Sequence, residues 1–195
     1  MLYLFCRFIV RTFFIVLYRL EARGISNIPL EGPVILCSNH KSLQDPITLG
    51  AWVPRKVHYM AKAELFRIPL FGPLIKGVGA FPVKRGGVSK EAIRTAITLL
   101  QKGQVMGIFP EGTRNESLGM GKRGAVSMAV RAKAFVVPVA LVGDYRLFRK
   151  MIAVYGAPID MRPYAEEGTS ESMEAATELI MSRIREMLET GKPAS

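Results

Sequence analysis

The stretch from Asn39 to Asp45 contains the pair of residues in this chain whose types and spacing most directly suggest chemistry. His40 is one of two histidines, and Asp45 follows it five positions later. A carboxylate that holds one imidazole nitrogen fixes the tautomer of the ring, so that the other nitrogen can act as a general base. Asn39 directly precedes this candidate base. Taken alone, the pair is also compatible with an ordinary loop, in which Asp45 caps the helix that begins at Pro46.

Two further polar segments follow apolar runs that are typical of strands. Lys84 and Arg85 come directly after the run at 81–83, and residues 111–114 come after the run at 105–109. Arginine forms charge-assisted and often bidentate hydrogen bonds with phosphate, and glycine lets backbone amides approach an anion closely. The two segments are therefore candidate parts of a polar site. The alternatives are a solvated strand end at the first segment and, at the second, a local ion pair worth under about 1 kcal/mol.

Short apolar runs that alternate with helical patterns predict the elements that must position these side chains. Strands are expected at 34–37, 57–61, 81–83, 105–109, 135–142 and 152–155, and helices from Asp45 and at 89–102, 125–133 and 170–188. This alternation predicts a single α/β domain with a central, largely parallel mixed sheet flanked by helices. In such folds the loops at the carboxyl ends of the strands form the site, so the three polar segments are expected to meet in one cleft.

The first 20 residues are almost wholly apolar and predict a helix at the surface of a membrane. Arg7 and Arg11 lie in the middle of this segment, where each would cost about 2.5–3.5 kcal/mol in a spanning helix. A helical wheel places one set of residues on a common face: Tyr3, Arg7, Arg11, Phe14 and Tyr18. We expect the opposite, apolar face to enter the acyl region, with the arginines among anionic headgroups. A spanning helix and a buried core helix are the alternatives. The expected division is an amphipathic anchor at 1–23 and the folded domain at 24–195.

The formal net charge of +11 favours an anionic partner, which could be a nucleic acid, an anionic membrane surface or a phosphorylated ligand. The sequence has no basic helix or aromatic–basic sheet motif, so we expect no nucleic-acid partner. It also has no cluster of cysteine and histidine with zinc spacing, and no metal site is predicted.

Four motifs in order along the chain resemble those of the glycerolipid acyltransferase family. They are Asn39-His40-x4-Asp45, Gly79-x5-Arg85, Phe109-Pro110-Glu111-Gly112-Thr113-Arg114 and Val137-Pro138-Val139. The resemblance runs from about Ile28 to Gly156 and is greatest to bacterial enzymes that acylate 1-acylglycerol-3-phosphate. It implies transfer of a fatty acyl group from acyl-CoA or an acyl-carrier protein to the free hydroxyl of lysophosphatidic acid, which yields phosphatidic acid. No cofactor is implied beyond this co-substrate.

The resemblance also implies roles for individual residues. His40 matches the general base, and Asp45 would hold its other ring nitrogen. Asn39 would position His40 or stabilise the developing oxyanion. The positions that match the site for the phosphate-bearing acceptor are Arg85, Glu111, Gly112, Thr113 and Arg114. Lys62 and Lys122 are further candidates for contact with phosphate or pantetheine, although Lys62 could be an ordinary surface lysine. Gly121 departs from the family pattern, in which an aromatic residue often precedes the lysine equivalent to Lys122.

Several alternatives stay open at the level of sequence. The same chemistry could act on glycerol-3-phosphate or another lysophospholipid, and a basic, anchored protein could bind lipids without catalysis. A hydrolase would use His40 to activate water or a serine, but the chain has no Gly-x-Ser-x-Gly motif. The apolar segment 66–78 could line an acyl-chain channel or be ordinary core. The expected location is the cytoplasmic face of the cell membrane, as a peripheral or monotopic protein.

Overall fold

The computed structural model describes residues 2–83, 90–110 and 118–194, with only the backbone of 118–123. The strands are β1 (Glu21–Arg23), β2 (Val34–Ser38), β3 (Val57–Lys62), β4 (Ala80–Val83), β5 (Val105–Ile108), β6 (Phe135–Val142), β7 (Ile152–Tyr155) and β8 (Ile159–Asp160). The α-helices are α1 (Leu2–Tyr18), α2 (Asp45–Gly50), α3 (Phe71–Gly77), α4 (Lys90–Gln101), α5 (Leu118–Ala132), α6 (Arg162–Glu167) and α7 (Ser170–Thr190), and 3-10 helices lie at Ile25–Asn27 and Ala63–Arg67.

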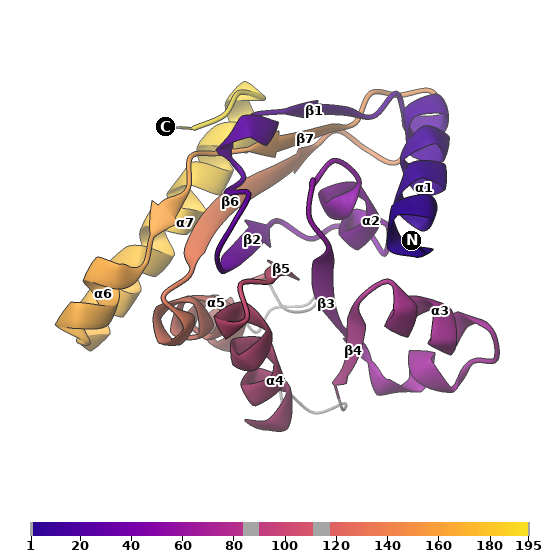
Figure 1. Cartoon of the computed structure of the whole chain (residues 1–195). Coiled ribbons are helices and arrows are strands. Elements are labelled where there is room, and N and C mark those ends of the chain that lie inside the picture. Colours follow the sequence, from indigo (N-terminus) through magenta and orange to yellow (C-terminus); the bar gives the residue numbers. More distant parts are fainter. Residues whose placement is uncertain (1, 84–89, 111–117, 195) are drawn as a thin grey trace.

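The strands form one mixed sheet in the order β1-β7-β6-β2-β5-β3-β4, with β8 paired to β6. The pairs of β6 with β7 and β8 are antiparallel, and the other pairs are parallel. β2 lies at the centre, and all five of its residues are buried. This explains its unbroken apolar sequence, because a strand covered on both faces has no solvent side. The predicted α/β fold with a largely parallel mixed sheet is confirmed (Figure 1).

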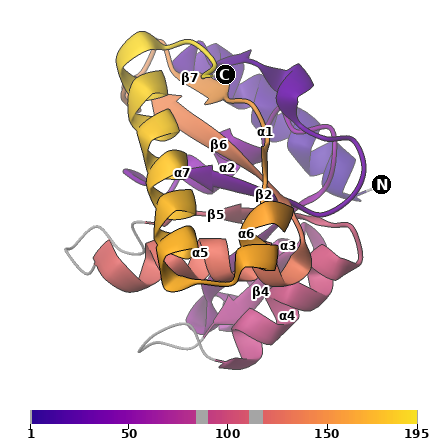
Figure 2. The ribbon, with the colours of Figure 1, turned by 90° about the vertical axis from the view of Figure 1, so that its left-hand side faces the viewer.

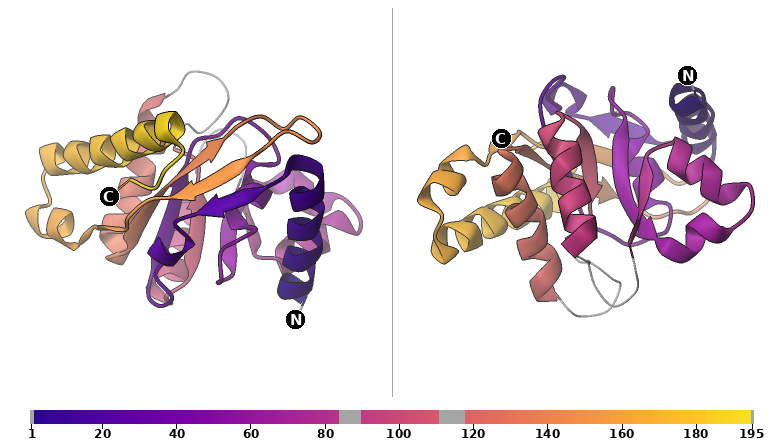
Figure 3. Two further views of the ribbon diagram at one scale, coloured as in Figure 1. Left: turned by 90° about the horizontal axis from the view of Figure 1, so that it is seen from above. Right: turned by 60° about the horizontal axis from the view of Figure 1, so that its bottom comes forward.

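Helices cover both faces of the sheet, and the side chains of β2 divide between two cores. Val34 and Leu36 point to the core that α1 and α2 complete, whereas Ile35 and Cys37 point to the core under α4, α5 and α7. Figure 2 shows α7 and α5 in front of the sheet with α1 behind it, and Figure 3 shows α4 beside α5. The alternation follows from the period of two in a strand. The sheet is thus a rigid platform whose edges carry the connecting loops.

Two backbone features of the second motif are explained by its place in the sheet. Pro82 cannot donate a ladder hydrogen bond, and the structure places its strand, β4, at the edge of the sheet. Gly79, which opens the second motif, has φ of +107°, and a Cβ there would lie 2.8 Å from Lys56. Glycine adopts this backbone conformation without strain. Gly79 is therefore required by the turn into β4, whatever else the motif does.

Other predictions differ from the structure in their boundaries. α5 begins at Leu118, although the sequence predicted a helix only from Ala125. The glycines at 119, 121 and 124 lower local helix propensity, but the helix forms nevertheless. β1, β8 and α6 were not predicted. These are short elements of two to six residues, and pairing or packing with distant segments determines them more than local sequence.

α1 packs on the domain through the face that the helical wheel identified, so the arginine-bearing face contacts protein and the apolar face stays outward. The Tyr3 hydroxyl bonds the backbone of Arg55 and Val57, the Arg7 guanidinium donates to the Val53 carbonyl, and the Arg11 guanidinium lies 5.0 Å above the Trp52 ring. The expectation that the arginines lie among headgroups is therefore wrong, because their partners belong to the protein. The apolar face of α1 points outward and exposes Leu2, Leu4, Phe5, Phe8, Ile9, Phe13, Ile15 and Val16.

In the ranges that the structure describes, none of the helices combines the length and the apolar character needed to cross a bilayer.

Candidate active site

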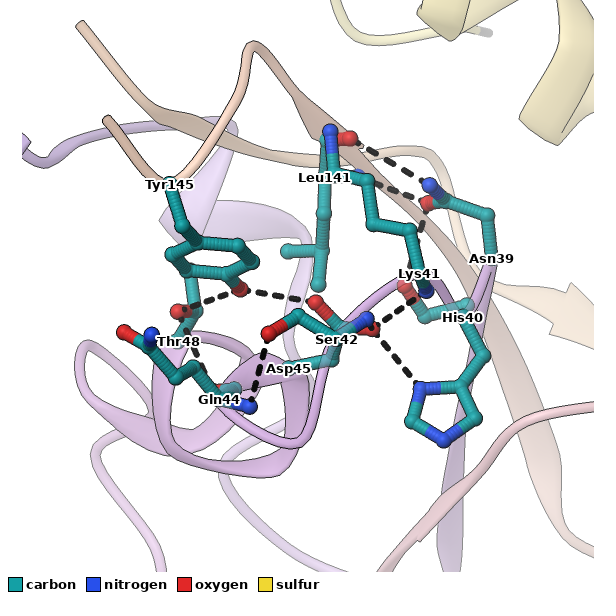
Figure 4. A network of polar contacts seen from close by, with 10 residues as sticks. Asn39, His40, Lys41, Ser42, Gln44, Asp45, Thr48, Leu141 and Tyr145 are labelled. Atoms are coloured by element: carbon teal, nitrogen blue, oxygen red, sulfur yellow. Dashed lines mark hydrogen bonds and ion pairs between the residues drawn. The ribbon is translucent and has the colours of Figure 1, made fainter. Parts of the chain in front are cut away.

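The histidine–aspartate pair forms at the point where the central strand ends. β2 stops at Ser38, the chain turns, and α2 begins at Asp45. His40 Nδ1 lies 2.7 Å from Asp45 Oδ2, as Figure 4 shows. An ionised carboxylate can only accept, so the hydrogen in this contact is on Nδ1, which makes Nε2 the basic nitrogen. The His40 side chain is 20% exposed, whereas the Asp45 side chain is 0% exposed. The ring is therefore accessible while its carboxylate partner is sealed in the protein.

The Asp45 carboxylate accepts hydrogen bonds from several donors in addition to His40. Oδ2 accepts from the backbone N–H groups of Lys41 at 2.6 Å and Ser42 at 2.7 Å, and Oδ1 accepts from the Tyr145 hydroxyl at 2.7 Å. Burial raises the pKa of Asp45, but these hydrogen bonds outweigh it and hold the pKa below the ordinary value of 3.8. The backbone donors precede the helix, and the N-cap of α2 is Gln44. The alternative role of Asp45 as a simple helix cap is therefore wrong.

Asn39 links this loop to the neighbouring strand β6. Its Oδ1 accepts from Leu141 N–H at 2.8 Å, and its Nδ2 donates to the Leu141 carbonyl at 3.3 Å. Both ends of the amide thus pair with one residue of the neighbouring strand, in the manner of a backbone peptide. This geometry ties the residue before His40 to the sheet.

Phe109 brings the third motif against the histidine. β2 and β5 are parallel neighbours that pair Cys37 with Ile108, so the residues that follow the two strands leave the same edge of the sheet. The Phe109 ring stacks on the His40 ring with centroids 4.4 Å apart and an interplanar angle of 25°. The first and third motifs therefore meet at His40 and Phe109. The expected convergence of the polar segments at 84–85 and 111–114 stays a prediction, because these segments lie outside the described residues.

The remaining predicted site residues are placed only in part. Lys62 is exposed and is the last residue of β3. Its backbone pairs with Val83 at the carboxyl ends of the parallel strands, the side of the sheet on which His40 also lies. Lys122 belongs to α5, but its side chain lies outside the described residues. Several candidates lie wholly outside them, namely Arg85, Glu111, Gly112, Thr113 and Arg114. Val137 and Val139 of the fourth motif are buried in the core that faces α1 and α2.

Sequence reasoning missed Tyr145 and Thr48, which extend the polar network behind Asp45. Tyr145 lies 100 positions from Asp45 in sequence, and Thr48 Oγ1 lies 2.9 Å from the Tyr145 hydroxyl. No local pattern marks such a tyrosine. Topology is the signal that could have found it, because β6 is parallel to β2 and therefore ends at the same edge of the sheet.

Comparisons with known proteins show to which family this chain belongs. The model of the family described as Acyltransferase matches residues 19–142, which is more than half of the chain. The chain belongs to the acyltransferase family. The 1-acyl-sn-glycerol-3-phosphate acyltransferase of Bacillus subtilis is 38% identical to it over 167 residues, covering 83% of this chain and 84% of the relative. The enzyme of the same name from Streptococcus pneumoniae is 31% identical, covering 81% of this chain and 61% of the relative.

A solved structure shows the same fold for this acyltransferase. The crystal structure of the 1-acyl-sn-glycerophosphate acyltransferase PlsC from Thermotoga maritima superposes with a TM-score of 0.69 at 27% identity, covering 87% of this chain and 70% of that one. The resemblance found in the four motifs is therefore confirmed at the level of the family.

The second histidine of the acyltransferase has a different place in the fold. His58 lies in β3, and its Nδ1 is 3.0 Å from the Gly79 carbonyl. Because a carbonyl can only accept, this ring donates from Nδ1. Burial lowers the pKa of His58, so the ring stays neutral at pH 7. His58 supports the turn before β4, and His40 is the histidine that is paired with a carboxylate.

Proposed function

We propose that this acyltransferase moves a fatty acyl group from an acyl thioester to the sn-2 hydroxyl of 1-acyl-sn-glycerol-3-phosphate and so makes phosphatidic acid. The observation that carries the chemistry is the 2.7 Å contact of His40 Nδ1 with the buried Asp45 carboxylate, just after the carboxyl end of the central strand β2. The choice of acceptor rests on the names of the relatives from Bacillus subtilis and Thermotoga maritima.

The chemical steps follow from the tautomer of His40. Nε2 takes the proton from the acceptor hydroxyl as its oxygen forms a bond to the thioester carbonyl carbon. The carbon–sulfur bond then breaks, and the thiolate leaves with the proton that the imidazolium returns. The products are the new ester and a free thiol, and the imidazole is neutral again. No acyl-enzyme is required, because holding both substrates together supplies much of the rate.

The remaining polar residues take supporting roles in this proposal. The pairing of the Asn39 amide with Leu141 favours positioning over oxyanion stabilisation. Arg85 and Arg114 bind the acceptor phosphate through charge-assisted hydrogen bonds, by the likeness of the motifs. Glu111, Gly112 and Thr113 shape that site, and Lys62 and Lys122 are candidates for the phosphate or the donor.

We further propose that α1 lies in the interface at the cytoplasmic face of an anionic membrane. The membrane anchor then consists of residues 1–23. A surface helix in water exposes its polar face, but α1 turns its arginines toward the protein and its apolar side chains outward. Contiguous exposed apolar surface of this kind marks a membrane or protein interaction site. The net charge of +11 favours anionic lipid as the partner. The lipid acceptor would then reach the site from the bilayer.

An acceptor panel tests the proposed function. The full chain on anionic vesicles is given acyl-CoA or acyl-carrier protein, and thiol release and the lipid product are both measured. The acceptors are 1-acylglycerol-3-phosphate, glycerol-3-phosphate, a lysophosphatidylcholine and a monoacylglycerol without phosphate. Fast turnover with the first acceptor alone supports the proposal. Preference for another acceptor would change the substrate, thiol release without any acceptor would indicate a hydrolase, and no release at all would leave a lipid-binding protein.

A further inference from the structure

We propose that Tyr145 is a positioning residue for the general base, which it serves by holding the Asp45 carboxylate through its hydroxyl. The inference rests on the proposed function, because it assigns a part in the same reaction. Tyr145 lies in the segment that follows β6 and approaches Asp45 from the side opposite to His40 (Figure 4).

The two oxygens of Asp45 have separate partners. Oδ2 serves His40 and the two backbone N–H groups of the turn, whereas Oδ1 is bonded by the Tyr145 hydroxyl at 2.7 Å. Among the residues that the structure describes, Tyr145 is the one donor to Oδ1. Asp45 is fully buried, so water is a poor substitute for that donor. A carboxylate without it would keep the three contacts of Oδ2 but lose the restraint on Oδ1, so that its plane could turn and weaken the alignment of Oδ2 with the imidazole.

Tyr145 is itself held in place on two sides. Its ring packs edge-on against Tyr18 of α1, with centroids 5.5 Å apart and an interplanar angle of 85°. Thr48 of α2 lies 2.9 Å from its hydroxyl. The phenol has one hydrogen, and the ionised carboxylate can only accept, so Tyr145 donates to Asp45. The single hydrogen of the Thr48 hydroxyl is shared between the Tyr145 oxygen and the Gln44 carbonyl, which lies 3.3 Å from it. The hydroxyl therefore has a defined direction.

β6 and the segment 143–151 that follows it contact the catalytic loop, residues 39–44, at further points. Leu141 pairs with the Asn39 amide, and the Gly143 carbonyl accepts from the Lys41 ammonium. At its other end, Phe148 N–H donates to the Leu17 carbonyl of α1. The segment thus connects the end of α1 to the catalytic loop. Within this segment, Tyr145 is the residue that contacts the Asp45 carboxylate.

The hydroxyl is suited to this role because it stays protonated. Burial and the neighbouring Asp45 carboxylate raise the pKa of Tyr145 well above its ordinary value, although the Thr48 contact opposes this. Tyr145 is accordingly a donor throughout the pH range in which the enzyme would work. Its hydrogen bond neutralises part of the carboxylate charge and leaves the rest to orient His40.

The test compares Tyr145→Phe with a matched control, Tyr155→Phe. Tyr155 is a buried tyrosine, whereas Tyr145 is partly buried. The Tyr155 hydroxyl also donates a hydrogen bond to α2, but its acceptor is the Leu49 carbonyl at 2.8 Å. Each variant loses one oxygen atom and keeps its ring. We expect Tyr145→Phe to lower kcat by about ten- to hundredfold, the range for a hydrogen bond to a charged group. The KM values for both substrates should stay within about twofold, because in this proposal Tyr145 acts through Asp45 and not on a substrate, while Tyr155→Phe retains wild-type kcat.

The pH profile separates positioning from a merely structural effect. Without the Tyr145 hydroxyl, Asp45 holds the imidazole proton more firmly, so the acid limb of kcat/KM should move to higher pH in Tyr145→Phe and not in Tyr155→Phe. Thr48→Val, which keeps the side-chain shape, should give a smaller loss of kcat in the same direction. An unshifted acid limb with kcat equal to that of Tyr155→Phe would overturn the role of Tyr145. Inactive wild-type protein would instead refute the proposed function, so the two failures are distinguishable.

Discussion

His40 Nδ1 and Asp45 Oδ2 lie 2.7 Å apart, and the exposures of the two side chains differ sharply, at 20% for the histidine and 0% for the aspartate. The base can therefore meet a substrate while its carboxylate is held by protein groups alone. Desolvation of Asp45 would favour its neutral form, but the hydrogen bonds from the loop and Tyr145 keep it ionised. The site thus holds a fixed negative charge behind an accessible imidazole.

Replacement of Asp45 by asparagine tests the tautomer. An amide can donate to Nδ1 and so turn the ring to the form in which Nε2 carries the hydrogen and cannot act as a base. We expect Asp45→Asn to lower kcat by about a thousandfold or more, as in other histidine–aspartate sites. Asp144→Asn is the control, because Asp144 is exposed in the neighbouring segment. Comparable kcat values for the two variants, measured by thiol release, would contradict the role of Asp45.

The depressed pKa of Asp45 also predicts how stability depends on pH. The folded protein binds this proton less readily than the unfolded chain does, so the carboxylate contributes stability above about pH 3.8 and loses it as the pH falls through the lower folded value. At pH 7, Asp45→Asn should lower the free energy of unfolding by about 1.5–3 kcal/mol. Urea unfolding of both proteins should show this difference shrinking below about pH 3.8. A difference that is constant with pH would mean that the pKa of Asp45 is not depressed.

Phe109 should restrain the His40 ring through the stacking seen at 4.4 Å. Aromatic pairs of this kind contribute about 0.5–1.5 kcal/mol beyond their buried area. We expect Phe109→Leu to lower kcat by about two- to tenfold, while Phe109→Tyr, which keeps an aromatic ring, retains most of the activity. Steady-state kinetics with saturating donor provides the comparison. If both substitutions reduce kcat equally, the size of the side chain rather than the stacked ring is what matters.

The outward apolar face of α1 makes a prediction about membrane binding. Phe8 is 60% exposed, and burying a phenylalanine side chain contributes about 1.5–3 kcal/mol. Phe8→Ser should therefore weaken binding to anionic vesicles by about tenfold or more in a sedimentation assay. Leu188→Ser is the matched control, since Leu188 is an exposed apolar residue on α7, away from α1. Equal binding of the two variants would show that α1 does not carry the membrane contact.

Several elements could be predicted from sequence because local pattern and tertiary environment agree. The unbroken apolar run of β2 indicates a strand covered on both faces, and all five residues of that strand are buried. The proline in β4 indicates either an edge strand or a bulge, and β4 lies at the edge. The meeting of His40 with Phe109 follows from parallel strands whose carboxyl ends share one edge. These predictions needed only periodicity and the general rules of α/β folds.

Other features depend on contacts that no local pattern encodes. The helical wheel groups Arg7 and Arg11 on one face of α1, but it cannot say whether that face meets lipid or protein. Tyr145 reaches Asp45 only because β6 is placed beside β2. β1 is three residues long, and its existence depends on pairing with β7. The phosphate-binding residues proposed at Arg85 and 111–114 stay predictions, since they lie outside the described part of the chain.

The most direct measurement of the central claim is thiol release from the acyl donor by the wild-type protein and by His40→Ala, with 1-acylglycerol-3-phosphate on the same anionic vesicles. His58→Asn is the matched control, because it changes the other histidine and keeps a donor for the Gly79 carbonyl. We predict that His40→Ala binds the vesicles normally and releases no thiol above background, while His58→Asn turns over as the wild type does. Turnover by His40→Ala at the wild-type rate would contradict the assignment of His40 as the base.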